Sequence, residues 1–237
     1  MKASYHVACT VAALMFSPAP VRAEGEQTCT LYPRPKAAAK AGDWVEYRMT
    51  GKVPATMRMA VTGVEGTGEN ALYWLEVSMS DAFQKGVVKS LLVGDPLTPK
   101  KVKRIIMKTG STPAMEIPPS MIAKIDLAKN PLQAQGPCAA NPGSGVAVPT
   151  EEKAVIAGKT VGVRVSRVER DGKKLVFKHS DGVPLTGLVF ADFGAQKVEL
   201  TGFGHDAKTQ ITEEPVPLEQ AMPGITDLPP PAAPATR

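Results

Sequence analysis

The sequence is poor in aromatic side chains, histidine and cysteine. Phe, Trp and Tyr make up 5% of the 237 residues, and the chain has three histidines and three cysteines. Proteins that bind single-stranded nucleic acid stack bases on aromatic rings, which are scarce here although the net charge is +5. A structural zinc site needs four clustered cysteine or histidine ligands. We therefore expect no nucleic-acid partner, no metal site and no cofactor.

Long apolar runs are also missing. The apolar stretch Val7 to Phe16 is far shorter than the roughly 20 residues that a membrane-spanning helix needs. It follows Lys2 and precedes the small-residue site Val21-Arg22-Ala23, an order typical of an export signal. We expect residues 1–23 to be a signal peptide and the mature chain to be periplasmic, with a secreted or outer-membrane-associated protein as the alternative. No transmembrane segment is expected after the signal is removed.

Removal of Cys9 with the signal leaves two cysteines, Cys29 and Cys138. An even pair in an oxidising compartment predicts a disulfide. It would close a loop of about 109 residues and contribute roughly 4 to 5 kcal/mol on the chain-entropy model. The alternative is two unpaired thiols.

Groups that carry out catalysis are few. His179-Ser180-Asp181 contains the residue types of a hydrolase triad, but neighbours on an extended strand point to opposite faces and cannot assemble one. His205-Asp206 follows an expected strand, where a polar pair typically caps a turn. We therefore expect no catalytic residues and no enzymatic activity.

The composition divides the chain into four parts. After the signal, residues 24–41 form an N-terminal extension, and residues 42–212 are expected to form one domain. Residues 213–237 contain seven prolines, which favour extended and disordered chain. We therefore predict a disordered proline-rich tail from Glu213.

The domain has the pattern of a series of strands. Apolar and polar residues alternate over residues 44–50, 57–64, 71–79, 86–94, 102–110 and 159–170, and short apolar segments separated by glycine turns follow within 171–182, 186–194 and 197–204. Helical spacing occurs once, as an insert near residues 120–129. The expected fold is mainly β (α+β): a strongly curved antiparallel sheet, or half-barrel, with one or few short helices and disordered termini.

Methionine is concentrated in the first half of the domain. Seven of the ten methionines lie between positions 49 and 121. Methionine adapts to varied shapes, so a strand face rich in methionine suits a pliable binding surface as well as an ordinary core. The predicted ligand-binding face consists of the apolar residues of three strands: Val45, Tyr47, Met49, Met57, Met59, Val61, Tyr73, Leu75, Val77 and Met79.

This order of elements resembles the periplasmic lipoprotein-carrier superfamily, which includes LolA, LolB and RseB-type proteins. The segments that carry the resemblance are "GDWVEYRM", "ALYWLEVSM", "VVKSLLVG", "VKRIIMKTG" and "GVPLTGLVF", within residues 42–204. The resemblance implies an unclosed, strongly curved sheet with helices as a lid and an apolar cavity for acyl chains. This sequence has fewer evident helices than the family pattern.

Two functions follow as expectations. The first is an exported, non-enzymatic binding protein that holds a lipid or acyl chain, or an acylated protein, in the concavity of the sheet. The second is a cell-envelope structural or interaction protein that docks on an envelope protein partner through the sheet face or the proline-rich tail.

Overall fold

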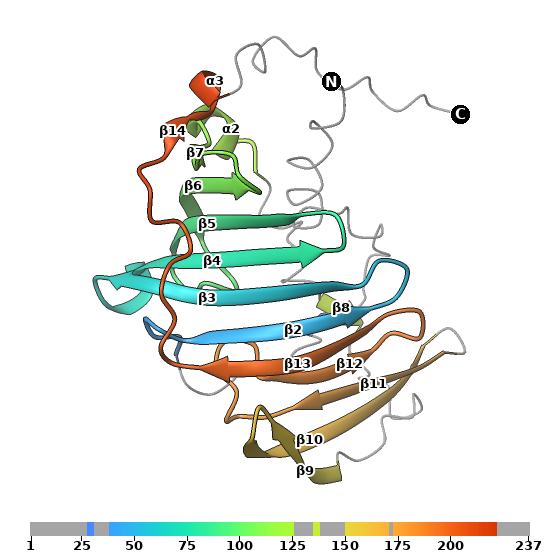
Figure 1. Cartoon of the computed structure of the whole chain (residues 1–237). Helices are drawn as coiled ribbons and strands as arrows, with labels where there is room; N and C mark the ends of the chain where they lie inside the picture. Colours follow the sequence, from blue (N-terminus) through green and yellow to red (C-terminus); the bar gives the residue numbers. More distant parts are fainter. Residues whose placement is uncertain (1–27, 31–37, 126–134, 138–149, 171–172, 222–237) are drawn as a thin grey trace, which may run out of the picture.

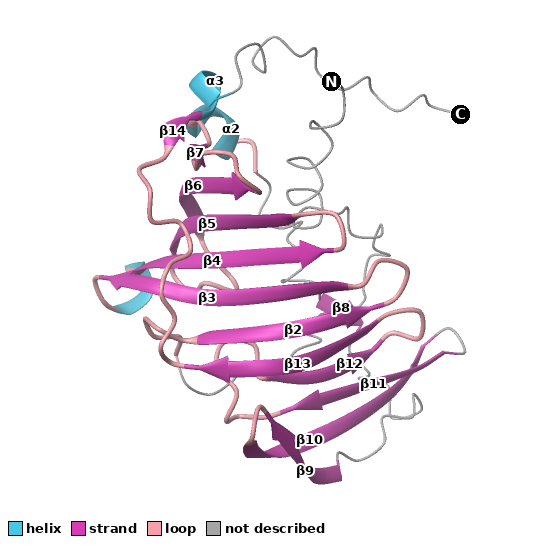
Figure 2. Cartoon of the chain, in the orientation of Figure 1, coloured by secondary structure: helices cyan, strands magenta, loops and turns pink. Residues whose placement is uncertain are grey.

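The computed structural model describes residues 28–30, 38–125, 135–137, 150–170 and 173–221. The first half contains β1 (Thr28–Thr30), β2 (Trp44–Thr50), β3 (Ala55–Glu65), η1 (Gly68–Asn70), β4 (Leu72–Asp81), β5 (Lys85–Val93), β6 (Lys101–Thr109), β7 (Met115–Glu116) and α2 (Pro119–Ile122). The second half contains β8 (Gln135–Pro137), β9 (Thr150–Ile156), β10 (Lys159–Arg170), β11 (Lys173–His179), β12 (Leu188–Asp192), β13 (Lys197–Gly204), β14 (Val216–Pro217) and α3 (Leu218–Ala221). The described chain is therefore mostly strand, with short helical segments only (Figure 2).

Twelve strands form one open sheet in the order β14-β7-β6-β5-β4-β3-β2-β13-β12-β11-β10-β9. Every pairing in it is antiparallel except the short parallel contact of β14 with β7. The strand directions rotate gradually along the sheet (Figure 1), as expected for the right-handed twist of β-strands. The prediction of a mainly β, antiparallel-rich fold is confirmed.

The sheet consists of two meanders that meet at β2 and β13. β2 to β7 pair in sequence order, as do β9 to β13. Because β13 pairs with β2, the segment at residues 183–204 lies near the middle of the sheet, where it joins the two halves of the chain.

The predicted strands occur where alternation was clearest, and the weaker patterns were missed. β9 was not predicted, because Glu151, Glu152 and Lys153 give its first half no apolar face. The expected helix near 120–129 is represented by α2, while residues 126–129 lie outside the described ranges.

The ordered fold extends beyond the expected boundary at residue 212. Val216 donates its backbone N–H to the carbonyl of Ala114, Leu218 is buried, and Lys108 pairs with Glu213 at 2.5 Å. These contacts hold residues 213–221 against β6 and β7, so the prediction of disorder from Glu213 is wrong for this part. Its prolines do not prevent order, because β14 lies at the edge of the sheet, where proline is tolerated. Residues 222–237 lie outside the described ranges, as do residues 1–23 of the expected signal.

Only one of the two cysteines of the predicted disulfide, Cys29, lies within the described residues. β1 pairs with β8 so that Cys29 lies opposite Gly136 and Thr28 opposite Pro137. Cys138 lies outside the described ranges, and the disulfide stays a prediction.

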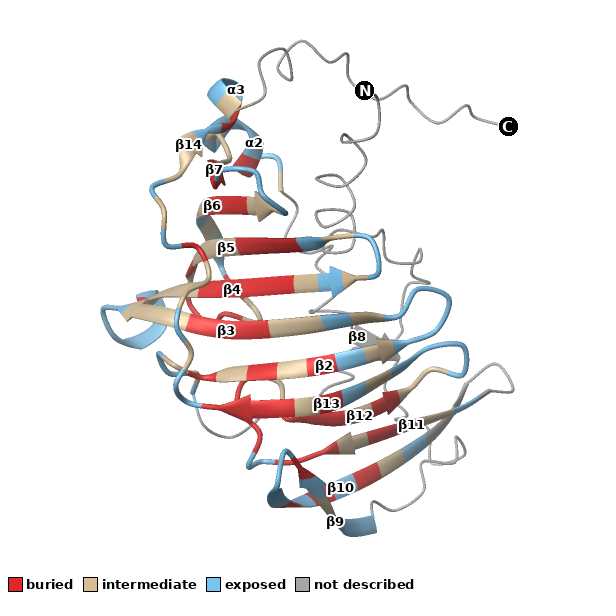
Figure 3. Ribbon diagram, in the orientation of Figure 1, coloured by how far each residue is buried: buried red, intermediate tan, exposed pale blue. Residues whose placement is uncertain are grey.

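None of the helices within the described ranges has the length and apolar character to span a membrane. The largest apolar cluster of the described residues lies on one face of β2, β3 and β4 and continues onto β10, β12 and β13. Figure 3 shows buried residues in the middle of β3 and β4 and at the arrowhead end of β13.

Candidate functional site

The ten residues of the predicted ligand-binding face all project from the same side of the sheet. Residues that pair directly in adjacent strands point to the same face. Val45 pairs with Met59 and Met59 with Val77, while Tyr47 pairs with Met57 and Met57 with Met79. Val61 pairs with Leu75, and Met49 and Tyr73 follow by alternation. We call this the apolar face.

Most of the apolar face is packed core. Six of the ten residues are at most 5% exposed: Val45, Tyr47, Met59, Val61, Leu75 and Val77. They belong to one apolar cluster with Val165, Phe177, Leu200 and other residues of the second meander. The chain thus covers these six side chains itself.

The loop before β12 completes this core. Val183 and Leu185 are buried in the same cluster, and Leu185 adopts a left-handed φ of 60°, which is unusual outside glycine. Tyr47 donates its hydroxyl hydrogen to the carbonyl of Leu188 at 3.1 Å and is also hydrogen-bonded to the hydroxyl of Thr186. The loop is therefore fixed over the apolar face by both packing and hydrogen bonds.

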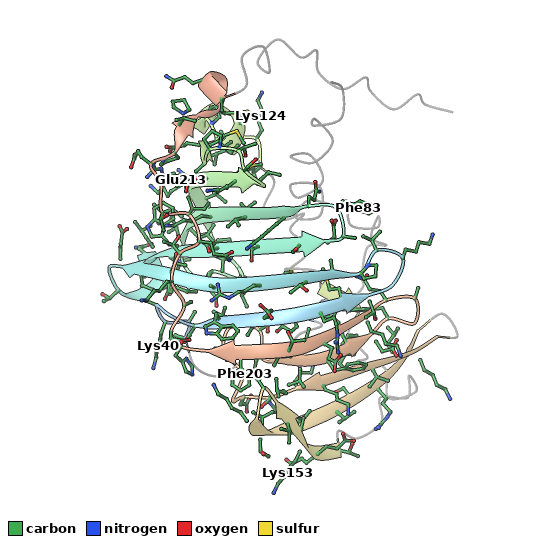
Figure 4. All side chains as sticks on the ribbon, in the orientation of Figure 1. Lys40, Phe83, Lys124, Lys153, Phe203 and Glu213 are labelled. Carbon is green, nitrogen blue, oxygen red and sulfur yellow. The ribbon has the colours of Figure 1, made fainter. Side chains whose placement is uncertain are left out.

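The remaining four residues, Met49, Met57, Tyr73 and Met79, are half-buried. The three methionines lie at the end of β2, β3 and β4 where the β2–β3 and β4–β5 hairpins turn. Two exposed apolar side chains occupy these turns: Val53 is 58% exposed and Phe83 is 89% exposed. Figure 4 shows Phe83 at the tip of its hairpin. We call Met49, Met57, Met79, Val53 and Phe83 the methionine end.

The opposite face of the same strands is polar and is organised around Trp44. The ring of Trp44 lies against Gly202 and Gly204 of β13, where an added Cβ would come within 3.1 Å and 2.7 Å of ring atoms. The guanidinium carbon of Arg58 lies over this ring, 5.0 Å from its centroid, in a cation–π contact. Gly202 and Gly204 are therefore needed at these positions because the Trp44 ring of the neighbouring strand β2 leaves no room for a side chain.

A segment that we call the strap, residues 205–215, crosses this polar face from the end of β13 to β14 (Figure 1). Glu76, although only 1% exposed, accepts hydrogen bonds from the backbone N–H of Gln210 at 2.9 Å and from the hydroxyl of Thr209 at 2.7 Å. Ile211 packs with Val87 and Ile106. A buried carboxylate and an apolar contact thus fix the strap to β4, β5 and β6.

A groove of about 510 Å³ lies between the strap and the sheet. Its lining consists of alternate strap residues and polar residues of β2 to β5: Glu46, Thr56, Arg58, Ser78, Ser80, Lys85, Asp206, Lys208 and Gln210. Asp206 accepts a hydrogen bond from the indole N–H of Trp44 at 2.8 Å. That bond, then a backbone hydrogen bond to the carboxylate, and then the charges of Lys159 and Arg58 keep the pKa of Asp206 below its ordinary value.

The two histidines of the domain lie in different surroundings. His179 is 3% exposed, and burial, with a further contribution from Arg164, lowers its pKa to about 4. Asp181, two residues on, pairs instead with Arg164 at 2.7 Å. The Nδ1 atom of His205 lies 2.6 Å from the carboxylate of Asp43. Among the described residues, no group of three metal-ligating side chains comes together.

Sequence reasoning found the apolar face but missed the groove and the strap. Alternation places Arg58, Ser78 and Lys85 on solvent-facing positions, which carries no specific signal. The strap was missed because its last residues, 213–215, belong to the proline-rich segment that we predicted to be disordered. The available signal was the pair of glycines at 202 and 204, which mark a close approach of another group to β13.

The comparisons with known proteins assign no family. No family model and no curated protein matches the chain. Among solved structures, one titled "Structure of PNGF-II in C2 space group" aligns at 10% identity with a TM-score of 0.26. The alignment covers 74% of this chain and 30% of that structure, so this chain corresponds to less than a third of its length. A similarity this weak carries no argument about fold or function.

Proposed function

We propose that this chain is a non-enzymatic, exported protein that binds a lipid or acyl chain on one side of a bent β-sheet. The proposal places the ligand at the methionine end and not over the whole apolar face. The observation that carries it is the exposure of Phe83 and Val53 at two neighbouring hairpin turns, beside three half-buried methionines.

The chemistry of this surface suits an acyl chain. Its side chains are apolar, and the methionine thioethers adapt to a flexible hydrocarbon at little cost. Large exposed side chains such as Phe83 gain roughly 2 to 3 kcal/mol when an apolar ligand covers them. Val53 adds a second apolar contact at the adjacent turn.

A bend of the sheet, as in a half-barrel, is part of the proposal. It is supported by the contact of Lys159 with the end of β13, where its ammonium donates to the carbonyl of Phe203 at 3.2 Å. β10 and β13 are separated by β12 and β11, so they would lie about 14 Å apart in a flat sheet. That distance exceeds the reach of a lysine side chain.

The test is displacement of a fluorescent fatty acid by palmitate, followed by native mass spectrometry of the complex. Replacement F83S is expected to weaken binding about 10-fold or more, because it removes the most exposed apolar contact. The matched control is V155S, which removes a 71% exposed apolar side chain from the edge strand β9, far along the sheet.

Absence of fatty-acid binding by the unaltered protein, or equal weakening in both variants, would overturn the proposal. Capture of an envelope protein that depends on Phe83 would instead favour the docking function. A partner lost on deletion of residues 222–237 would assign docking to the proline-rich tail.

A further inference from the structure

The groove on the polar face is lined by three positively charged side chains. Arg58, Lys85 and Lys208 all line it. The ion pairs formed by the described residues involve other cations, such as Arg48 with Glu199, Arg104 with Glu116 and Lys108 with Glu213. Within the described ranges, none of the three groove cations lies within ion-pair distance of a carboxylate.

Arg58 is positioned by Trp44 and forms no ion pair within the described ranges. Its guanidinium lies over the Trp44 ring, which in turn is fixed by Gly202, Gly204 and Asp206. The N–H groups of a guanidinium match the geometry of a carboxylate or phosphate. Within the described ranges Arg58 donates no hydrogen bond, so its N–H groups are available to a ligand in the groove.

Lys85 lies beside two hydroxyl groups on the same face. Ser80 pairs directly with Lys85 on one side and with Thr56 on the other. Directly paired residues have Cβ atoms about 5 Å apart, so the three side chains form a continuous row of donors. Ser80, Thr56 and Lys85 are all exposed. Lys208 faces this row from the strap.

The two carboxylates of the groove already have partners. Asp206 accepts from Trp44 at 2.8 Å, and Glu46 lies within hydrogen-bond distance of the hydroxyl of Thr201 at 3.3 Å. Their charges reduce the positive potential, but they leave an excess of one positive charge among the groups that line the groove. That excess and the hydroxyl row favour an oxygen-rich anion over a cation.

We propose that the groove between the strap and the sheet binds a small molecule through an oxyanion, a phosphate or a carboxylate group. Arg58 and Lys85 contact the oxyanion from the sheet and Lys208 from the strap. A volume of about 510 Å³ falls within the range of small-molecule sites. This site lies on the opposite face from the core and does not depend on lipid binding at the methionine end.

The experiment is isothermal titration calorimetry of the full chain with glycerol 3-phosphate and with succinate, at low ionic strength. We expect saturable binding of at least one probe, and about a 10-fold or greater loss of affinity in the double variant K85Q/K208Q. The matched control is K101Q/K103Q, which makes the same charge change at exposed lysines of β6. All four lysines are exposed, so none of these variants is expected to unfold the protein.

The two probes distinguish the source of the oxyanion. Binding of glycerol 3-phosphate alone assigns a phosphate site, and binding of succinate assigns a carboxylate site. If neither probe binds, or if the control variant loses as much affinity as the groove variant, the proposal is overturned. Fatty-acid binding measured on the same variants is expected to be unchanged, which separates this test from that of the methionine end.

Discussion

The two faces of β2, β3 and β4 are covered in different ways. On the apolar face, Tyr47, Met59 and Val61 are at most 1% exposed and pack against the second meander. On the polar face, Glu76 is just as buried, but it is covered by the strap and satisfied by hydrogen bonds from that segment. One face is sealed by packing, and the other is partly covered by a single polar segment.

This difference shows where binding space is found in the molecule. A continuous apolar cluster is filled by its own side chains, because each uncovered apolar group costs free energy. A polar face has no such requirement, and a strap anchored at a few points leaves a groove between them. The apolar ligand is therefore expected at the margin of the apolar face, and the polar ligand within the polar face.

The strongest test of this comparison introduces the same charge on each face of β3. M59K places an unpaired ammonium in the core, and we expect it to cost more than about 4 kcal/mol and to unfold the domain. T56K, three residues away on the opposite face, is expected to change stability by less than about 0.5 kcal/mol. Urea denaturation followed by circular dichroism measures both. Equal effects would show that the two faces do not differ in packing.

The next largest effect is expected at the anchor of the strap. E76A removes the carboxylate that accepts from Gln210 and Thr209 and leaves these donors unsatisfied, at a cost of about 3 kcal/mol. Amide hydrogen exchange at Gln210 and Ile211 is expected to accelerate in parallel. E199A breaks a more exposed ion pair with Arg48 and is expected to cost at most about 1 kcal/mol. An unchanged exchange rate in E76A would contradict the assignment of Glu76 as the anchor.

The apolar environment of His179 predicts a dependence on pH. Its folded pKa of about 4 lies below the ordinary value of 6.5, so the unfolded chain binds more protons between these values. Stability should therefore be full above about pH 6.5 and should fall by about 2 to 3 kcal/mol as the pH is lowered to about 4.5.

The measurement for His179 is the change in unfolding free energy between about pH 7 and about pH 4.5. H179L is expected to lose this share of the pH dependence whatever its stability at neutral pH. An identical pH dependence in both proteins would show that His179 is not the group responsible.

The smallest expected effect concerns the packing of Trp44. G204A places a methyl group 2.7 Å from the indole nitrogen, so the ring must shift away from Asp206, at a cost of about 1 to 2 kcal/mol. G162A adds the same methyl group to open space on β10 and should have little effect. Tryptophan fluorescence and urea denaturation report the difference. A fluorescence spectrum unchanged by G204A would contradict the contact.

The sequence predicted most of the strands and which side of the sheet their side chains face. It did not predict the groove or the segments that cover each face. Alternation from Trp44 to Thr50 is enough to define an apolar and a polar side of β2. It does not indicate what covers each side. Val45 and Met59 look the same in the sequence whether they line a cavity or fill a core, because the covering residues, Val183 and Leu185 among them, lie more than a hundred positions away. Arg58 gave no signal for the same reason, since its partner Trp44 belongs to another strand.

What the sequence alone determined is local: the mainly β fold, the antiparallel order of neighbouring strands, and the separation of apolar from polar residues on each strand. These properties follow from backbone geometry and the two-residue period of a strand. The pairing of β13 with β2, the filled centre of the apolar face and the strap across the polar face were decided only by the tertiary structure. They depend on contacts between distant segments, which form because of complementary shape and hydrogen bonding that no local pattern records.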